Sequence, residues 1–301
     1  MIATRNVLSP AVRPESAIRI IDGQSIAVIV PTYNRASQVT ALVERLLDKQ
    51  SFVDFDVIVV DDGSSDSTLA SLGRIDDDRL SVIERSHGGV SARRNDGASS
   101  TAADWLIFLD SDDDVDVDWL ESFARLMRND VDIISLGQRR IESGRTIVRS
   151  PDDGGAAFGH IEALWQAGAF SVRRALFHEV GGYEERLDFS ENTELALRIA
   201  ARHTTSPLGV AVDPAAHSTV HVRQGRYEAG QQRSTAEFLL ETHGDQLKLD
   251  RRLIADYSAI AGVAARRLGD RRAAITHLAR AIRNRPSDAR HVLRLLRSLL
   301  P

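Results

Sequence analysis

Three short runs of apolar, mostly β-branched or aromatic residues stand out in the first 110 positions. They are residues 26–30, 57–60 and 105–109. Each run is too short for a helix and is apolar at consecutive positions, which is typical of a strand buried on both faces of a parallel sheet. Between the first two runs, Leu42, Leu46 and Leu47 recur at helical spacing. The pattern predicts an α/β fold with a mostly parallel central sheet and flanking helices.

The same alternation continues around these runs. We expect helices over 67–72 and 90–100, a strand over 80–83, and a strand entering a helix over 170–174. Polar residues follow each buried run directly, at the carboxyl end of the predicted strand. In open α/β sheets this edge is where ligands bind.

Composition restricts the compartment and the metal chemistry. The 301 residues include no cysteine, so a metal would need carboxylate or histidine ligands. A secretory apolar segment and a run of about 20 apolar residues are both missing from the sequence. We therefore expect a cytoplasmic protein, with residues 1–24 forming an N-terminal arm without chemistry.

Six aspartates crowd the end of the third buried run, between positions 110 and 118. Like charges this close need a cation or hydrogen-bond donors nearby. Asp114, Asp116 and Asp118 fit a solvated turn that caps the next helix. Asp110 and Asp112 leave a buried strand at the ligand edge, where hard oxygen atoms suit Mg²⁺ or Mn²⁺ together with substrate phosphates.

A second acidic pair, Asp61 and Asp62, ends the preceding central strand and is expected to converge with Asp112 on the same edge. One of the pair suits a nucleobase N–H or a ribose hydroxyl, and the alternative is an Asx turn, more plausible for Asp61. The sequence contains neither GxxxxGK[ST] nor GxGxxG, so a bound diphosphate would depend on the metal.

Five fragments in this order resemble the family 2 glycosyltransferases of the GT-A fold, over about residues 25–225. They are PTYNR at 31–35, VVDDGSSD at 59–66, GGVSARRNDG at 88–97, FLDSDDD at 108–114 and GGYEERLDFSENTELALR at 181–198. Each fragment alone is a weak signal. Five in order, each at a strand end or a helix start, are specific.

The resemblance implies a role for each matching residue. The nucleotide-binding side chains would be Pro31, Tyr33, Arg35, Asp62, Arg94 and Asp110. Pro31 and Tyr33 would line the base pocket, and Asp62 would accept the base N–H. Asp112 would bind Mg²⁺ or Mn²⁺, with Asp110 beside it, and His221 is a further candidate ligand.

The resemblance also implies transfer of a sugar from a nucleotide-sugar to an acceptor hydroxyl, with inversion in a single displacement. Family members usually take the general base from a Glu-Asp pair, but this chain reads Glu191-Asn192. An amide cannot accept a proton at neutral pH. Glu191 is the first replacement and Glu194 the second. A catalytically impaired binding or scaffold protein is the alternative function.

The end of the chain differs in both pattern and charge. Residues 251–301 carry twelve arginines and three aspartates, a net charge of +9, which leaves −14 for residues 1–250. Small and apolar positions between Ala255 and Asp288 have the spacing of one tetratricopeptide repeat, with a third helix over 291–300 covering its open side. We therefore expect a GT-A domain over 25–233 and a helical region over 234–301.

The partners follow from this division. A nucleotide-sugar is the expected sugar source, and the acceptor is a carbohydrate, a lipid-linked molecule or a small molecule. Nucleic acid is excluded because no aromatic residues interleave with the arginines and the chain is acidic overall. The basic helices either dock on an acidic domain, including that of a homodimer partner, or contact an anionic membrane surface.

Overall fold

The computed structural model describes residues 24–187, 189–222 and 227–299. The arm predicted for residues 1–24 thus lies outside the described residues, apart from Gln24. The side-chain oxygen of Gln24 accepts a hydrogen bond from the Trp105 indole at 2.7 Å, so the described chain is tied to the sheet from its first residue.

Strands and helices alternate as predicted in the first half of the chain. The elements are β1 (Ile26–Thr32), α1 (Ala36–Lys49), β2 (Phe55–Asp61), α2 (Thr68–Leu72), β3 (Leu80–Glu84), α3 (Val90–Ser99), β4 (Trp105–Phe108), β5 (Asp114–Val115) and α4 (Trp119–Leu126).

The second half adds long strands and then helices only. The elements are β6 (Ile133–Glu142), β7 (Arg145–Arg149), β8 (Asp152–Asp153), the 3₁₀ turn η1 (Ala156–Phe158), β9 (Glu162–Ala163), β10 (Phe170–Arg173), α5 (Arg174–Glu179), α6 (Glu191–Thr205), β11 (Val210–His221), α7 (Ala229–Thr242), α8 (Gly244–Leu247), α9 (Arg251–Arg267), α10 (Arg271–Asn284) and α11 (Ala289–Leu299).

The main sheet has nine strands in the order β3-β2-β1-β4-β10-β6-β11-β5, with β7 paired to β6. The strands β3, β2, β1 and β4 are parallel, as are β6 and β11. Strand β10 is antiparallel to both of its neighbours, β4 and β6. The predicted α/β fold class, with a central sheet and flanking helices, is confirmed. The carboxyl ends of β1, β2 and β4 meet at one edge of this sheet.

Helices cover both faces of the sheet, which explains why the central strands are apolar at every position. Ile26, Val28 and Val30 face a core that includes α1 and α4. Ala27 and Ile29 face a second core that includes α3, α5 and α6. Successive side chains of a strand point to opposite faces, so each strand needs apolar residues for both layers.

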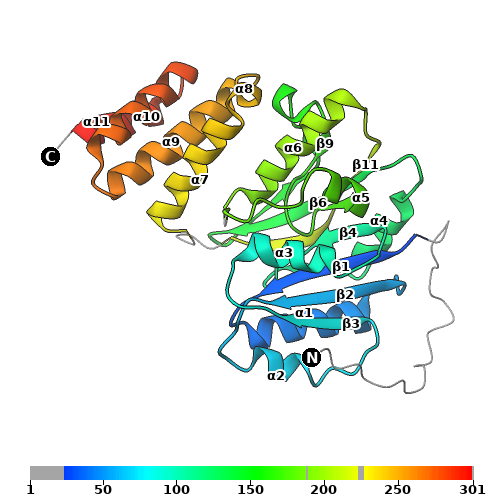
Figure 1. Ribbon diagram of the computed structural model, residues 1–301. Coiled ribbons are helices and arrows are strands. Elements are labelled where there is room, and N and C mark those ends of the chain that lie inside the picture. The colour runs from blue at the N-terminus through cyan, green and yellow to red at the C-terminus, as the bar shows by residue number, and fades with distance from the viewer. Residues whose placement is uncertain (1–23, 188, 223–226, 300–301) are drawn as a thin grey trace.

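The C-terminal helices form a separate layer beside the sheet, from α7 to α11 (Figure 1). Helix α7 begins at Ala229, five residues before the predicted boundary at 234. Ala157 and Leu197 of the sheet domain share an apolar cluster with side chains of α7, α8 and α9. In the described part of the chain, no helix is long and apolar enough to cross a bilayer.

Helices α9 and α10 form the predicted antiparallel pair. A Cβ atom on Gly262 would lie 2.7 Å from Leu278 Cγ, so glycine is what allows the two helices to approach. Gly269 makes the turn with a φ of +82°, and the Asp270 side chain caps α10 by accepting a bond from the Ala273 N–H at 3.0 Å. The assignment of this pair as a tetratricopeptide repeat stays a prediction.

Helix α11 lies beside this pair. We expected the helix to cover the open side of the pair, and the side chains that it buries are His291 and Ser298, at 1% and 3% exposure. Its leucines lie mostly on the outer side. The reason lies in helical spacing, because residues 291 and 298 share a face that excludes most of the leucines.

We predict that G262A destabilises the fold by about 1–3 kcal/mol, because the added methyl group overpacks the α9–α10 contact against Leu278. The matched control is G230A in α7, where an added Cβ meets no atom within 4 Å. It should leave stability unchanged or raise it by up to about 1 kcal/mol. Urea unfolding measures both, and equal effects would contradict the close packing.

Candidate functional site

A cavity of about 160 Å³ lies at the carboxyl ends of β1, β2 and β4, where the sequence places the ligand edge. The lining residues are Pro31, Thr32, Tyr33, Arg35, Asp62, Val90, Arg93, Asp110 and Ser111. Five of the six predicted nucleotide-binding residues are therefore brought together. Arg94 is the exception, and the neighbouring Arg93 lines the cavity in its place.

An aromatic surface stands at one side of the cavity. The rings of Tyr33 and His87 have centroids 4.9 Å apart, and Tyr33 is 46% exposed. An exposed ring next to a polar cavity can stack with a planar ligand such as a nucleobase. His87 belongs to the loop before α3, which the sequence marked only as a loop.

The two aspartates that end β2 do different things. Asp61 accepts bonds from the backbone N–H groups of Gly63 at 3.1 Å and Ser64 at 2.8 Å, which is the Asx turn weighed for this position. Asp62 accepts bonds from the N–H groups of Gly88 at 2.8 Å and Gly89 at 3.1 Å. Asp62 therefore anchors the loop before α3, and it also lines the cavity. Its two oxygens lie 2.8 Å from His87 Nδ1 and 3.4 Å from Arg93 Nη1.

A buried arginine joins the two halves of the site. Arg94, at 1% exposure, donates to Asp110 Oδ1 and to Glu191 Oε1, each at 2.7 Å. Burial opposes a charged guanidinium, but the two carboxylates outweigh it and the pKa of Arg94 is raised. Two acids 81 positions apart, one ending β4 and one starting α6, are thereby held by a single cation.

Asn192 belongs to the same network. Its side-chain oxygen accepts a bond from the Tyr183 hydroxyl at 2.8 Å, and its amide nitrogen donates to Glu191 Oε1 at 3.4 Å. Burial raises the pKa of Tyr183 above its ordinary value, which keeps the hydroxyl protonated and donating. The Tyr183 ring also lies 5.1 Å from the Arg94 guanidinium carbon. Asn192, which stands where family members usually carry an aspartate, therefore has a defined place in this hydrogen-bond network.

Asp110 and Asp112 have the chemistry of a Mg²⁺ or Mn²⁺ site. They are hard oxygen donors two residues apart after a buried strand, and their side chains keep 19% and 10% exposure beside the cavity. Asp112 also pairs with Arg35, with Nη1 and Oδ1 2.6 Å apart. The residues present fit a divalent cation, which would share Asp112 with Arg35.

The structure does not bring His221 to these aspartates. His221 Nε2 lies 2.9 Å from Asp114 Oδ2, on a carboxylate that also pairs with Arg45. Burial would raise the pKa of Asp114, but bonds from Arg45 and His221 lower it below its usual range. His221 thus takes part in a three-residue ion cluster across β11 and β5.

A further acidic group was not identified from the sequence. Asp116, Asp118 and His217 present ligand atoms within 4.8 Å of one another. Asp116 is already paired with Arg139 at 2.6 Å, which reduces its attraction for a cation. Asp118 occupies the N-cap position of α4 but makes no capping bond, contrary to the turn interpretation of this aspartate.

Glu194, the second candidate base, lies in a different cluster. It is 2% exposed and contacts Arg198 Nε at 2.8 Å and His243 Nε2 at 3.0 Å. His243 follows α7, so this contact ties the helical layer to α6. The spacing of Glu194 and Arg198 indicated their ion pair, whereas nothing local in the sequence indicates His243.

Helix α9 also reaches the start of α6. The Tyr257 side chain forms hydrogen bonds with Ser190 and Thr193, which flank Glu191 and Asn192. Burial raises the pKa of Tyr257, so the hydroxyl stays neutral. The helical layer therefore supports the segment that carries the candidate base, which no sequence motif indicated.

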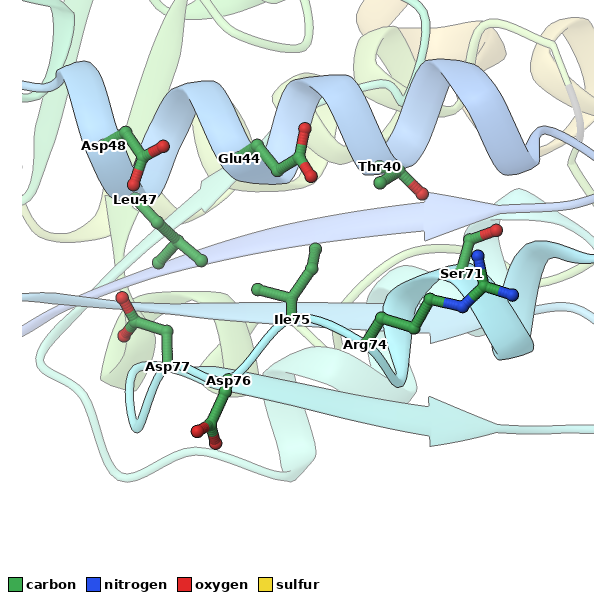
Figure 2. A pocket seen from close by; sticks show the side chains of 9 residues that line it. All are labelled: Thr40, Glu44, Leu47, Asp48, Ser71, Arg74, Ile75, Asp76 and Asp77. Carbon is green, nitrogen blue, oxygen red and sulfur yellow. The ribbon is translucent and has the colours of Figure 1, made fainter. Parts of the chain in front are cut away.

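A second cavity, of about 370 Å³, lies elsewhere, between α1 and the segment joining α2 to β3. Figure 2 shows its lining, which includes the acidic side chains Glu44, Asp48, Asp76 and Asp77 around a single Arg74. Four carboxylates against one arginine disfavour a diphosphate electrostatically. None of the predicted site residues lines it, so the smaller cavity is the candidate site.

Comparison with known proteins identifies the family. The model of the family described as "Glycosyl transferase family 2" matches residues 27–182, just over half of the chain. The chain belongs to glycosyltransferase family 2. The family match covers the cavity, the Arg94 segment and the strands of the main sheet other than β11, and it ends before α6.

Relatives with curated descriptions agree with this membership. The chain is 29% identical over 219 residues to the succinoglycan biosynthesis protein ExoO of Rhizobium meliloti, covering 66% of this chain and 61% of that protein. It is 31% identical over 129 residues to the poly(ribitol-phosphate) beta-N-acetylglucosaminyltransferase TarS of Staphylococcus aureus (strain Mu50), covering 41% and 22%. The chain thus spans less than two thirds of the length of either relative.

Solved structures show the fold. The S. aureus TarS 1–349 structure in complex with UDP-GlcNAc matches with a TM-score of 0.62 at 20% identity, covering 87% of this chain and 81% of that one. The mannosyltransferase PcManGT of Pyrobaculum calidifontis, in complex with GDP-Man and Mn²⁺, matches with a TM-score of 0.57 at 16% identity, covering 95% and 89%. The GT-A architecture is therefore confirmed.

We predict that E194Q lowers the free energy of unfolding by about 2–3 kcal/mol at pH 7, because a buried charged partner of Arg198 and His243 is lost. Burial would raise the pKa of Glu194, but bonds from His243 and Arg198 lower it below its ordinary 4.5. A lowered carboxyl pKa stabilises the fold above pH 4.5, and this stability is lost as pH falls through the folded value.

Urea unfolding of wild type and E194Q between pH 7 and pH 3 measures this dependence. The difference in the free energy of unfolding between the two proteins should become smaller as the pH falls below about 4.5. A difference that stays constant down to pH 3 would show that ionisation of Glu194 does not stabilise the fold.

Proposed function

We propose that this chain is a metal-dependent glycosyltransferase that moves a sugar from a nucleotide-sugar to an acceptor hydroxyl. The observation that carries the proposal is the cavity lined by Pro31, Tyr33, Arg35, Asp62 and Asp110, which brings residues of three separate sequence fragments to one sheet edge. Family membership supports the reaction class, and the solved complexes of the two structural neighbours with UDP-GlcNAc and GDP-Man support the ligand class.

The cavity offers a distinct group for each part of a nucleotide. Tyr33 supplies a flat surface for the base, and Asp62 an acceptor for a base N–H. Asp110 lies where a ribose hydroxyl or a cation can reach it. Arg35 and Arg93 also line the cavity, where Arg35 pairs with Asp112 and Arg93 with Asp62 and Asp96. A bound diphosphate would compete with these carboxylates for the guanidinium groups. This division of roles makes a nucleoside diphosphate the ligand that fits best.

A divalent cation held by Asp110 and Asp112 would supply the positive charge that stabilises the departing diphosphate. Arg35 pairs with Asp112 and donates to the Ser111 hydroxyl, so a cation at Asp112 would share that carboxylate with Arg35. The pairing thus keeps the two charges neutralised before the nucleotide binds.

We assign the general base to Glu191. Within the described residues, its contacts with Arg94 and Asn192 are both made by Oε1, which leaves Oε2 to accept the proton of the acceptor hydroxyl. Attack from the face opposite the diphosphate then inverts the anomeric centre in one displacement. The Tyr183 hydroxyl holds the Asn192 side chain, which in turn donates to the Glu191 carboxylate. Asn192 does not accept the proton itself.

A non-catalytic function is the second candidate, because Glu191 is already engaged by Arg94 and its neighbour is an amide. Such a chain would bind a nucleotide and use the helical layer as a scaffold. The acceptor is proposed to be a hydroxyl of a carbohydrate, a lipid-linked molecule or a small molecule. A homodimer and a peripheral membrane contact through the basic helices are further proposals.

We predict that UDP, GDP or dTDP raises the melting temperature in the presence of Mn²⁺ and that D112A abolishes this shift, because the metal-binding carboxylate is lost. Sugar transfer should fall by about 10²–10³. The control D118A alters the other acidic group and should keep the shift. If D118A loses the shift and D112A keeps it, the metal binds at the cluster of Asp116, Asp118 and His217, and the assignment to Asp112 is wrong.

We predict that E191Q lowers kcat by about 10²–10⁴ while the dissociation constant of the nucleotide stays nearly the same, because the amide cannot take the proton. E194Q is the matched control and should turn over near the wild-type rate. If wild type binds nucleotide but transfers no sugar to any acceptor hydroxyl offered, the scaffold function is favoured. If E194Q loses turnover instead, the assignment of the base is wrong.

A further inference from the structure

Helix α11 is turned with its apolar side outward. Val292, Leu293, Leu296 and Leu299 are 40%, 56%, 53% and 46% exposed, while the polar His291 faces inward at 1%. These four aliphatic residues recur at helical spacing and form one stripe. Large exposed apolar stripes on a folded protein mark surfaces that are covered by something else.

The turn between α9 and α10 extends this surface. Leu268 is 52% exposed, and exposed arginines flank it on both sides in the order Arg266, Arg267, Arg271 and Arg272. Arg271 Nη2 donates to the backbone oxygen of Leu299, which places the turn beside the carboxyl end of α11. The stripe and the turn together are called the basic tip below.

Among the described residues, no acid of the sheet domain forms an ion pair with the arginines of the basic tip. The nearby acids are already paired within the helical layer, Asp270 with Arg233 at 3.0 Å and Asp288 with Arg290 at 2.6 Å. Arg285 likewise pairs with Asp256 at 3.8 Å. The arginines around Leu268 therefore present charge outward, in a segment with a net charge of +9.

We propose that the basic tip binds the surface of an anionic phospholipid membrane. Leucines on one side of a short helix with arginines beside them are suited to the boundary between headgroups and acyl chains. The arginines attract anionic headgroups, and the −14 of residues 1–250 turns the rest of the molecule away from them. The separation of positive and negative charge along the chain thus favours an anionic membrane as the partner and directs the basic tip toward it.

Other occupants match the surface less well. Two basic tips facing each other in a dimer would bring like charges together. The exposed apolar residues of the sheet domain, such as Val82, Val117 and Ile147, lie on different elements and form no matching stripe. A membrane offers both negative charge and an apolar layer.

This inference deepens the proposed function, and the biological meaning of membrane binding rests on that function. A tip docked on lipid would hold the α6 segment, which α9 supports through Tyr257, at a fixed height above the membrane. The acceptor class favoured by that placement is a lipid-linked hydroxyl. Membrane binding itself requires no sugar transfer and is measured without it.

The test uses flotation of the full chain with vesicles of phosphatidylcholine alone or with 30% phosphatidylglycerol. We expect binding to the anionic vesicles, weakened by salt, and little binding to the neutral ones. Absence of binding to anionic vesicles at low salt would overturn the proposal. The proposal would also be overturned if light scattering showed a salt-independent dimer formed through these leucines and the chain bound no vesicles.

Two variants locate the surface. Replacing the arginines with R266Q, R267Q and R272Q together should weaken vesicle binding by roughly a hundredfold. Replacing the leucines with L268S, L293S and L296S should weaken it at least tenfold. The matched control removes the same charge from the sheet domain with R74Q, R145Q and R149Q and should bind as wild type does.

Thermal unfolding and the nucleotide-induced shift of each variant complete the design. Variants that keep both but lose vesicle binding support the basic tip. Equal losses in the tip variants and the control would show only a general charge effect and overturn the assignment. A wild type that binds vesicles but transfers no sugar would refute the proposed function and leave the membrane surface standing.

Discussion

The buried guanidinium of Arg94 is the contact on which the arrangement of the site depends. It is 1% exposed and bonds to Asp110 after β4 and to Glu191 at the start of α6. Removing either carboxylate would leave a buried charge without a full set of partners, which is costly in a protein interior. The segment after β4 and the start of α6 are therefore held together by a single side chain.

The helical layer is part of this arrangement rather than an appendage. Tyr257 of α9 contacts the two residues that flank the Glu191-Asn192 pair, and His243 after α7 contacts Glu194 on the same helix, α6. Apolar packing through Ala157 and Leu197 reinforces these polar contacts.

Sequence patterns sufficed for features set by local chemistry. Runs such as 26–30 and 105–109 predicted buried strands, because a sheet covered on both faces needs apolar residues at every position. Strand ends then placed Asp62 and Asp110 at one edge. The partners of Arg94 and Tyr257, and the His243 partner of Glu194, could not be found this way, because each of these contacts joins residues that lie between 16 and 97 positions apart. The outward leucines of α11 were missed because an amphipathic pattern does not say which side is covered.

The central claim is that Asp112 and Asp110 hold the cation that a bound nucleoside diphosphate requires. Anomalous X-ray diffraction from a crystal containing Mn²⁺ and UDP or GDP tests it directly. The account predicts one manganese peak about 2.1 Å from an Asp112 oxygen, at the edge of the cavity lined by Tyr33. A peak between Asp116, Asp118 and His217, with the nucleotide bound and Asp112 still paired to Arg35, would contradict it.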